Sequence, residues 1–328
     1  MLSPRMGEGM SGLIKARLIA LAAMTALLAA CGGGGGTGTV LPSSGGNNVQ
    51  SSPDRGELTS TGLFTAVGDA GVTMRVLPTR DVLSNARVTM ATSNLQYYGG
   101  PVQTAPQLYL IEWGSAWSST GDPDGVASRL KSFYGVIGGG AWLATVTQYT
   151  QSNGQHVGNA GNIYTAVWQD TGTKPPSRPT QSQIAAEAVR AAAHFGNYSA
   201  NASYVIAMPH GIKPSGFGTQ YCAWHSSTSS SGGTIAYTNL PYMPDAGASC
   251  GADSVNSGGT LDGVTIVSGH EQAETETDPQ PNSGWLDSSG SEIGDKCAWV
   301  SLENNPNAGG YPTQPLWSNA NNGCVQSY

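Results

Sequence analysis

The chain is poor in charge and has no basic cluster. Its 328 residues include 14 Lys and Arg against 21 Asp and Glu, charged residues make up 11% of the total, and the formal net charge is −7. Proteins that bind nucleic acid hold its phosphates with clustered Lys and Arg side chains. An acidic chain without such a cluster is therefore expected to have no nucleic-acid partner.

Two loops that often carry catalysis are also missing. No Gly-x-Ser-x-Gly segment forms a tight turn that leads directly from a strand pattern into a helix pattern, which argues against a serine nucleophile of the α/β-hydrolase type. The glycines at 138–140 are not followed by Lys-Ser or Lys-Thr, so they do not form a phosphate-binding loop. Catalysis through either loop is therefore not expected.

Residues 1–31 are predicted to be a lipoprotein signal peptide. Basic residues precede the apolar run 18–28, which is too short to cross a bilayer as a stop-transfer helix. Small residues then precede Cys31, as lipoprotein signal peptidase requires, so Cys31 is expected to be lipidated. Cleavage of an ordinary secretory peptide after Ala30 is the alternative. In both cases the protein is exported, and the lipid would hold it on the outer membrane or cell surface.

Cysteine is scarce in the rest of the chain. Besides Cys31 there are Cys222, Cys250, Cys297 and Cys324, an even number in an oxidising compartment. Four cysteines can pair in three ways. We favour Cys222–Cys250 and Cys297–Cys324 because each pair closes a short loop, and the sequence leaves the other pairings open. No cysteine is left over for a catalytic thiol.

The remaining chain divides into a linker and one domain. Residues 32–97 are predicted to be a flexible, Gly- and Ser-rich tether and lead-in, with an ordered lead-in after residue 58 as the alternative. Residues 98–328 are predicted to form a single α+β domain with a mixed sheet, since about 230 residues suffice for one core. Expected helices are 122–134, capped by Asp124, then 142–149 and 181–195; expected strands are 108–111, 163–168, 204–208 and 234–238.

The segment 269–279, Gly-His-Glu-Gln-Ala-Glu-Thr-Glu-Thr-Asp-Pro, has the spacing of a metal-binding helix. His270 and Glu274 are four apart and so lie one turn apart on one helix face, with Glu271 beside them. This is the H-E-x-x-H layout with Glu274 in place of the second His. In that helix two side chains hold zinc, and the Glu between them polarises a metal-bound water. Glu292, 18 residues after Glu274, is expected to return as a third ligand from a second helix.

Less specific interpretations of the same residues remain open. His270, Glu271 and Glu274 would also suit a solvated acidic helix face. His225 follows Cys222 by three, but a disulfide at Cys222 removes it from a Cys-x-x-His metal pair. His225 is instead expected to line a cleft and stabilise a developing oxyanion, with an ordinary loop histidine as the alternative.

Several segments resemble the exordium (phosphate-induced protein) family of plant cell-wall proteins and their bacterial relatives. The resemblance covers residues 98–328 and is carried by Gly99–Val102, Leu108–Ile111 with Trp113-Gly114, Cys222–His225, Asp262–Pro279, and Trp285 followed by Glu292–Cys297. It implies an extracellular location but no accepted reaction. The lipidation signal and a short loop between Cys222 and Cys250 depart from the family pattern.

The same helix also resembles that of gluzincin metallopeptidases, the thermolysin-like group, which implies a zincin-like domain. The resemblance implies His270, Glu274 and Glu292 as metal ligands and Glu271 as general base. Asp295 and Asp278 would orient the ligands without touching the metal. One imidazole and two carboxylates make a hard, anionic site, so the expected ion is zinc, with calcium or manganese as alternatives.

Together these patterns predict an exported lipoprotein that is a metal-dependent peptidase, acting on a peptide or cell-wall substrate. The alternative is a non-catalytic cell-surface protein of the exordium type. In that case the acidic cluster is structural and exposed aromatic side chains bind wall polysaccharide.

Overall fold

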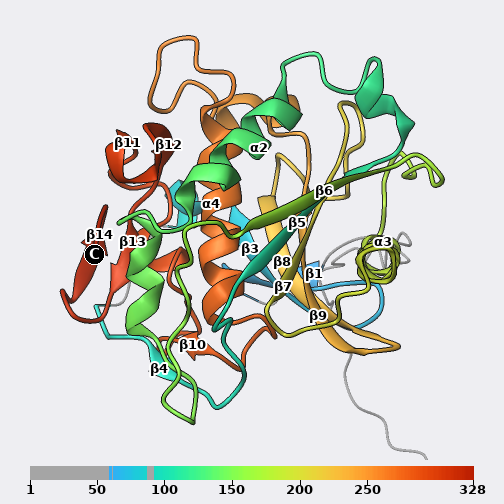
Figure 1. Cartoon of the computed structure of the whole chain (residues 1–328). Helices are drawn as coiled ribbons and strands as arrows, with labels where there is room; N and C mark the ends of the chain where they lie inside the picture. The colour runs from blue at the N-terminus through green and yellow to red at the C-terminus, as the bar shows by residue number, and fades with distance from the viewer. Residues whose placement is uncertain (1–58, 61, 87–91) are drawn as a thin grey trace, which may run out of the picture. The chain divides into compact units, whose positions relative to one another are not determined.

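Eight strands form one mixed sheet, in which the spatial order of neighbouring strands is β1-β2-β3-β8-β9-β7-β5-β6 (Figure 1). The computed structural model describes residues 59–60, 62–86 and 92–328. The strands of this sheet are β1 (Thr59–Ser60), β2 (Thr65–Val67), β3 (Thr73–Pro78), β5 (Gln107–Trp113), β6 (Tyr164–Asp170), β7 (Ala202–Ala207), β8 (Tyr221–Ser230) and β9 (Gly233–Leu240). Strands β6, β5, β7 and β9 run parallel, whereas β8 is antiparallel to β9 and β3 is antiparallel to β8. The predicted α+β class with a mixed sheet is confirmed.

Helices lie on both faces of the sheet. They are α1 (Arg80–Ala86), α2 (Val126–Ile137), α3 (Gln181–Phe195) and α4 (Asp262–Thr277). Successive residues of a strand point to opposite faces. His225 of β8 faces α4, while the neighbouring Ser226 pairs in register with Tyr237, whose hydroxyl accepts a hydrogen bond from Gln181 of α3. Helices α3 and α4 therefore cover opposite faces.

Short two-stranded sheets and 3-10 turns complete the domain. The pairs are β4 (Gln96–Tyr97) with β10 (Trp285–Leu286), β11 (Glu303–Asn305) with β12 (Tyr311–Thr313), and β13 (Leu316–Ser318) with β14 (Gly323–Val325). The 3-10 helices are Ser115–Ser118, Leu143–Gln148, Met243–Cys250, Asp295–Cys297 and Pro306–Ala308. Contacts from α2, β12 and these turns enclose α4 on the side away from the sheet.

Local signals account for the helices. Helix α3 has the predicted bounds, because Thr180 and Gln183 form a reciprocal capping box at its start. The expected cap of α2 is wrong: the helix begins at Val126, and Asp122 rather than Asp124 accepts hydrogen bonds from its first amides. The segment 142–149 forms a 3-10 helix.

The two disulfides join Cys222 to Cys250 and Cys297 to Cys324, which confirms the favoured pairing. Disulfides of this kind are consistent with an exported protein. None of the helices in the described ranges has the length and hydropathy required to span a membrane. The signal peptide with Cys31 and the tether 32–57 lie outside the described residues.

The amino-terminal boundary of the domain differs from the expected one. Residues 59–78 supply β1, β2 and β3, and β3 is hydrogen-bonded to β8 of the main sheet. The ordered lead-in is therefore the correct alternative for these residues, and the domain begins before residue 98. The sequence signal was weak because β2 and β3 are short and their residues face protein on both sides.

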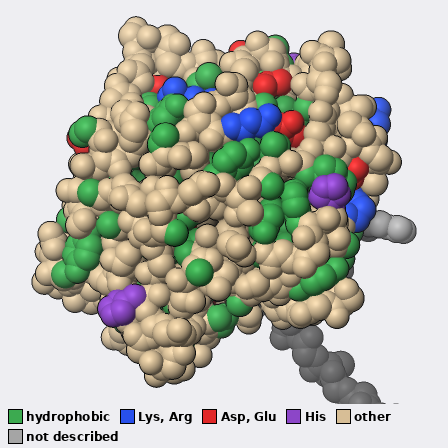
Figure 2. All heavy atoms as spheres, in the orientation of Figure 1, with side chains coloured by type: hydrophobic (Ala, Val, Ile, Leu, Met, Phe, Trp, Pro, Cys, Tyr) green, Lys and Arg blue, Asp and Glu red, His purple; other side chains and the backbone are tan. Residues whose placement is uncertain are grey.

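The molecular surface carries few charged side chains on the face drawn in Figure 2. On the face drawn in Figure 2, acidic and basic side chains occur as scattered spots among uncharged polar atoms and backbone. Most of the acidic groups of the motif 269–279 and of the segment 287–295 are instead buried. The acidic character of the sequence is therefore concentrated inside the domain.

Candidate metal centre

Helix α4 is buried along its whole length although ten of its sixteen residues have polar side chains. All sixteen residues from Asp262 to Thr277 are buried, and Gly269 lies so close to Trp142 that a Cβ there would approach the indole to 2.8 Å. The apolar half, with Val264, Val267 and Ala273, packs into the core. A buried helix is ordinarily apolar all round, so the polar half must meet partners inside the protein.

His225 of β8 faces the polar half of α4. Its Nδ1 atom lies 3.3 Å from Glu271 Oε2 and 3.7 Å from Glu274 Oε2, and its Nε2 atom lies 3.6 Å from Glu292 Oε1. His225 therefore lies on a strand beside the polar side of α4 and is not a loop histidine, and its expected role at a developing oxyanion stays a prediction. The sequence did not predict β8, because its Ser- and Thr-rich half lacks alternating apolar residues.

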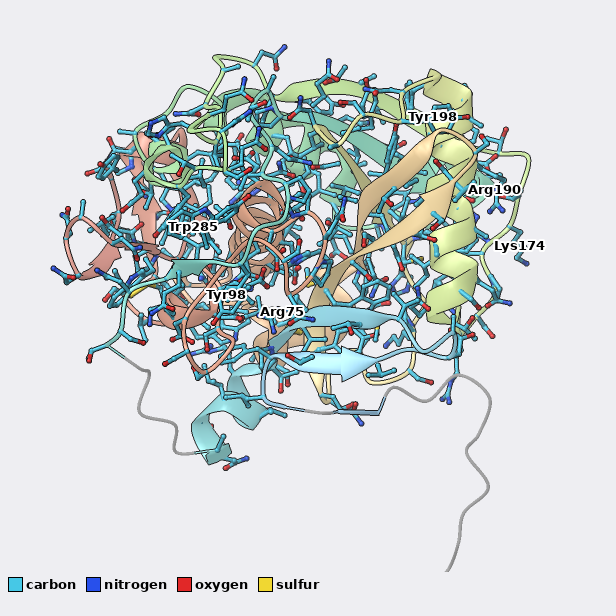
Figure 3. The ribbon with its side chains drawn as sticks, turned by 90° about the horizontal axis from the view of Figure 1, so that it is seen from below. Arg75, Tyr98, Lys174, Arg190, Tyr198 and Trp285 are labelled. Carbon is cyan, nitrogen blue, oxygen red and sulfur yellow. A yellow bond between two sulfur atoms is a disulfide. The ribbon has the colours of Figure 1, made fainter. Side chains whose placement is uncertain are left out.

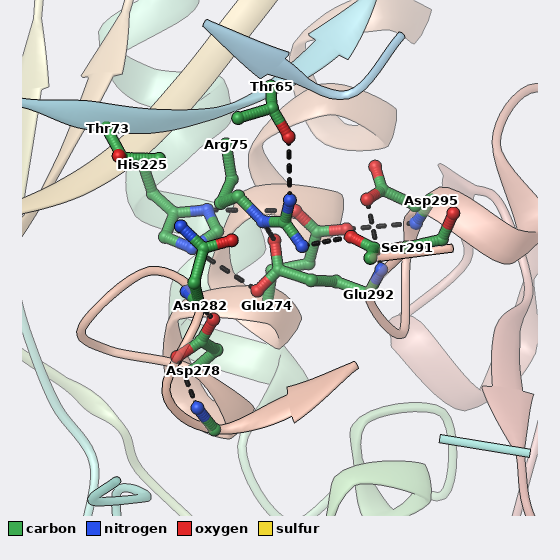
Figure 4. Close-up of polar contacts among 12 residues, drawn as sticks. Thr65, Thr73, Arg75, His225, Glu274, Asp278, Asn282, Ser291, Glu292 and Asp295 are labelled. Atoms are coloured by element: carbon green, nitrogen blue, oxygen red, sulfur yellow. Dashed lines mark hydrogen bonds and ion pairs between the residues drawn. The ribbon is translucent and has the colours of Figure 1, made fainter. Parts of the chain in front are cut away.

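The segment after β10 supplies two more carboxylates. The Asp295 amide donates to Glu274 Oε1 over 2.9 Å (Figure 4). Asp295 Oδ1 lies 3.8 Å from His270 Nε2. The Glu292 amide in turn donates to Asp295 Oδ2 over 3.0 Å. Gly294 lets this loop approach the helix, because a Cβ there would lie 2.6 Å from His270 Nδ1. The expected second helix is wrong: in residues 278–328 there are strands and 3-10 turns, and Glu292 lies in a loop.

Arg75 is a member of the cluster that the sequence analysis missed. It lies opposite His225 in the β3–β8 register and therefore points to the same face of the sheet. Its Nε donates to Glu292 Oε2 over 3.0 Å, Nη1 donates to Thr65 Oγ1 over 2.8 Å, and Nη2 donates to the Gly290 carbonyl. Figure 3 shows Arg75 between the blue amino-terminal strands and the elements that carry the site. In the sequence, the signal that could have singled out Arg75 was its place as the one charged residue in the alternating apolar stretch 72–76.

The donor atoms form two compact groups that share Glu274. One contains His270, Glu274 and Asp295, and the other contains His225, Glu271 and Glu274, with the potential ligand atoms of each group within 4.8 Å of one another. In the first group His270 Nε2 is 3.1 Å from Glu274 Oε1 and 3.8 Å from Asp295 Oδ1. Ligand atoms about 2.0–2.2 Å from one ion are about 3–3.5 Å apart, so this spacing suits a common cation.

Asp295, and not Glu292, belongs to one of the two compact donor groups. Neither compact group includes Glu292, whose Oε2 atom pairs with Arg75. Asp295, expected only to orient a ligand, lies within reach of the His270 ring. Asp278 holds a turn instead, because its carboxylate accepts hydrogen bonds from the amides of Asn282, Ser283 and Gly284.

Burial leaves several polar atoms of the cluster without hydrogen bonds. His225, His270, Glu274 and Glu292 are 0% exposed and Arg75 is 2% exposed. Within the described residues, atoms without a hydrogen-bond partner include His225 Nε2, both ring nitrogens of His270, Glu271 Oε1, Glu274 Oε2 and Glu292 Oε1. Buried polar atoms are nearly always paired, so unpaired atoms gathered in one cluster make that cluster a candidate ligand site.

Charge in the cluster is unbalanced. Burial raises the pKa of Glu271, Glu292 and Asp295 well above the usual range of carboxyl groups, and repulsion from Glu274 raises each further. Burial alone would also raise the pKa of Glu274, but the adjacent imidazoles and Arg75 lower it below its ordinary value. Four carboxyl groups therefore compete for one guanidinium, and a bound cation would stabilise their ionised forms.

His225 is a neutral ring at neutral pH. Burial lowers its pKa to about 4, although Glu274 opposes that shift. A neutral imidazole has one N–H donor and one lone pair, so it can either ligate a metal or donate to an oxygen. Its position between Glu271 and Glu292 permits both uses.

No protein-family model, no curated protein and no solved structure matches this chain.

Proposed function

We propose that this chain is an exported metal-dependent hydrolase that binds one divalent cation through His270, Glu274 and Asp295. The observation that carries the proposal is that His270 Nε2, a buried atom without a hydrogen-bond partner, lies 3.1 Å from Glu274 Oε1 and 3.8 Å from Asp295 Oδ1. One imidazole and two carboxylates fit zinc, and the hard oxygen donors also fit manganese or calcium. Glu292, the ligand expected from the sequence, is replaced by Asp295 in this set.

Peptide hydrolysis is the reaction that the neighbouring groups suit best. A bound divalent cation supplies Lewis acidity to a water molecule and to a carbonyl oxygen. Glu271 follows the ligand His270 on the helix, and its Oε1 atom has no hydrogen-bond partner, so it can take a proton from that water. The neutral His225 lies 3.3 Å from Glu271 and can donate its ring N–H to the oxyanion that develops.

The proposed fold and location rest on the resemblances to gluzincin metallopeptidases and to the exordium family. A helix carrying His-Glu-x-x-Glu, packed against a mixed sheet beside an antiparallel strand, supports a zincin-like arrangement. The exordium resemblance and the disulfides support a protein that acts outside the cytoplasm, with lipidation at Cys31 as part of the proposal. A peptide or cell-wall component is the proposed substrate.

A second candidate is a non-catalytic cell-surface protein in which the same centre is a structural metal staple. The complete burial of the site favours it, because a substrate needs access to an open metal position and a structural site does not. This candidate predicts bound metal without hydrolysis. It also predicts stabilisation by wall glycans through exposed aromatic residues such as Tyr98, which is 54% exposed.

Elemental mass spectrometry of the purified chain and of Glu274→Ala tests the metal centre. About one equivalent of zinc in the wild type, lost in the variant, is the expected result. The absence of metal from both proteins would refute the centre. Glu271→Gln then separates the two candidates: the hydrolase requires it to keep the metal and lose turnover of a peptide library, and full activity of this variant would contradict the mechanism.

A further inference from the structure

The strand that carries His225 would be an edge strand without the amino-terminal segment. Strands β1, β2 and β3 all precede residue 79, and the later strands form the order β8-β9-β7-β5-β6. An edge strand presents unpaired N–H and C=O groups, and extended peptides bind proteins by pairing with such edges. In this protein β3 occupies that edge.

Strand β3 is bound along β8 at several points. Arg75, Val76 and Leu77 pair in register with His225, Trp224 and Ala223. The Ser226 hydroxyl donates to the Thr73 carbonyl over 2.7 Å, and the Trp299 indole donates to the Pro78 carbonyl over 2.8 Å. These contacts are made to the backbone of the six-residue strand β3. Most of them therefore depend little on which side chains the strand carries.

The backbone of β3 also reaches the proposed general base. The Leu77 backbone lies close enough to the Glu271 carboxylate to oppose the rise in the pKa of that group that burial causes. A peptide lying as β3 lies would therefore have its backbone against Glu271, beside the donor group of His270, Glu274 and Asp295. This is the position that a substrate of the proposed hydrolase would need.

Arg75 is the side chain of β3 that reaches deepest into the cluster. Its guanidinium is buried against Glu292 and the Gly290 carbonyl. Glu292 belongs to neither compact donor group, so its carboxylate is available for a basic side chain and not required for the cation. A buried carboxylate that accepts from guanidinium selects strongly for Arg, because an uncharged side chain would leave the carboxylate unpaired.

Packing between the segment and the rest of the domain is incomplete. A partly open pocket of about 250 Å³ lies there, lined mainly by Leu63, Ala66 and Val76 of the segment, by Val82 of α1, and by Gln220 and Tyr221 at the start of β8. The segment therefore does not completely fill the surface beside the start of β8.

We infer that the groove along β8 binds extended peptides that place an arginine on Glu292, and that residues 59–78 of this chain occupy the groove in cis. The inference rests on the proposed hydrolase, since it names the substrate class and the self-inhibition of that site. It accounts for the burial of the centre: β3 and Arg75 cover the groups that a substrate would contact. The full-length chain is accordingly inhibited while the segment, held in place by its covalent connection, occupies the groove.

The test uses the full chain with a site-specific protease sequence inserted between Ala86 and Thr92. After cutting, the amino-terminal piece should stay bound and then be displaced by a synthetic peptide of residues 72–79, measured by size exclusion and mass spectrometry. The matched peptide with Arg75→Gln should displace it about 10-fold or more weakly, because it leaves Glu292 unpaired. The uncut chain, the control, should bind neither peptide.

Two outcomes would overturn the inference. Equal displacement by both peptides would remove the role of Arg75 and Glu292. Loss of the circular dichroism signal of the folded domain when the segment leaves would make residues 59–78 an integral part of the fold. Repeating the experiment with chelator separates this inference from the hydrolase: displacement that persists while no turnover is found with zinc would refute the hydrolase alone.

Discussion

The thermal stability of this protein should depend on a divalent cation, and Glu274 should carry that dependence. Glu274 belongs to both compact donor groups, with Oε1 toward His270 and Oε2 toward His225. Glu274→Gln keeps the size and shape of the side chain and removes the charge that would hold the ion. The comparison therefore isolates the ion from the packing of α4.

The size of the effect follows from linkage. An ion present at 100 times its dissociation constant stabilises the folded state by about 2.7 kcal/mol. For a domain of about 240 residues, each kcal/mol raises the melting temperature by about 2–4 °C, so zinc should raise it by about 5–10 °C over the chelated protein. The shift should saturate near one equivalent of zinc. In Glu274→Gln it should fall to less than about 2 °C, since the two remaining ligands hold the ion weakly.

Thermal unfolding followed by circular dichroism, first in chelator and then with zinc, manganese or calcium added back, measures this shift. Glu303→Gln is the matched control, because Glu303 is exposed on β11 and should keep the full shift. Equal shifts in wild type and Glu274→Gln would refute the assigned ligand. No shift with any of the three ions would refute the metal centre itself.

Three further predictions concern sites that the structure singles out. Burial raises the pKa of Glu187 to about 7, with Arg190 opposing the shift, so the folded chain keeps a proton that the unfolded chain releases from its ordinary pKa of 4.5. The free energy of unfolding should therefore fall as pH rises from about 4.5 to 7, and Glu187→Gln should remove up to about 3 kcal/mol of that fall, measured by urea unfolding at several pH values. Gly294→Ala should abolish the zinc-dependent melting shift, because its Cβ would lie 2.6 Å from His270 Nδ1. Replacing both Cys222 and Cys250 with alanine should lower the free energy of unfolding by about 3–4 kcal/mol, from the loop entropy of a 28-residue separation, measured by chemical denaturation.

Each of these has an outcome that contradicts it. Identical pH profiles for wild type and Glu187→Gln would show that its proton is not linked to folding. Gly135→Ala is the control for Gly294→Ala: no atom lies within 4 Å of its added Cβ on α2, so it should keep the zinc shift and stabilise the chain by about 0.5–1 kcal/mol. A double cysteine variant as stable as the wild type would mean that this disulfide does not constrain the unfolded chain.

Elements governed by neighbouring residues were predictable. Helix α3 has a capping box at its first turn and a continuous alanine-rich pattern, so its bounds follow from local signals. Helix α4 brings His270 and Glu274 to one face because helical periodicity alone sets their spacing. The disulfide pairing also followed from short loops, and all three predictions hold in the structure.

Elements governed by partners distant in sequence were not predictable. Strand β8 has Ser and Thr where a half-buried strand would alternate, and it forms because β3 and β9 pair with it on both sides. Asp122 was not predicted as the cap of α2 because it lies four residues before the first helical residue. Its carboxylate reaches forward across a turn to the first amides of the helix. Burial of the acidic cluster likewise depends on the segment 59–78, which sequence patterns left undecided.

The sequence by itself determined the chemical groups of this protein: a helix with an imidazole and two carboxylates on adjacent faces, a second acidic segment, and four cysteines beyond Cys31. Their spacing is a property of one helix and of short loops, so it needs no tertiary contact. Only the tertiary structure decided that His225 faces that helix, that Asp295 rather than Glu292 approaches His270, and that Arg75 covers the site. These relations join residues 20 to more than 200 positions apart, and the packing of the sheet and loops around α4, rather than any local pattern, sets their distances.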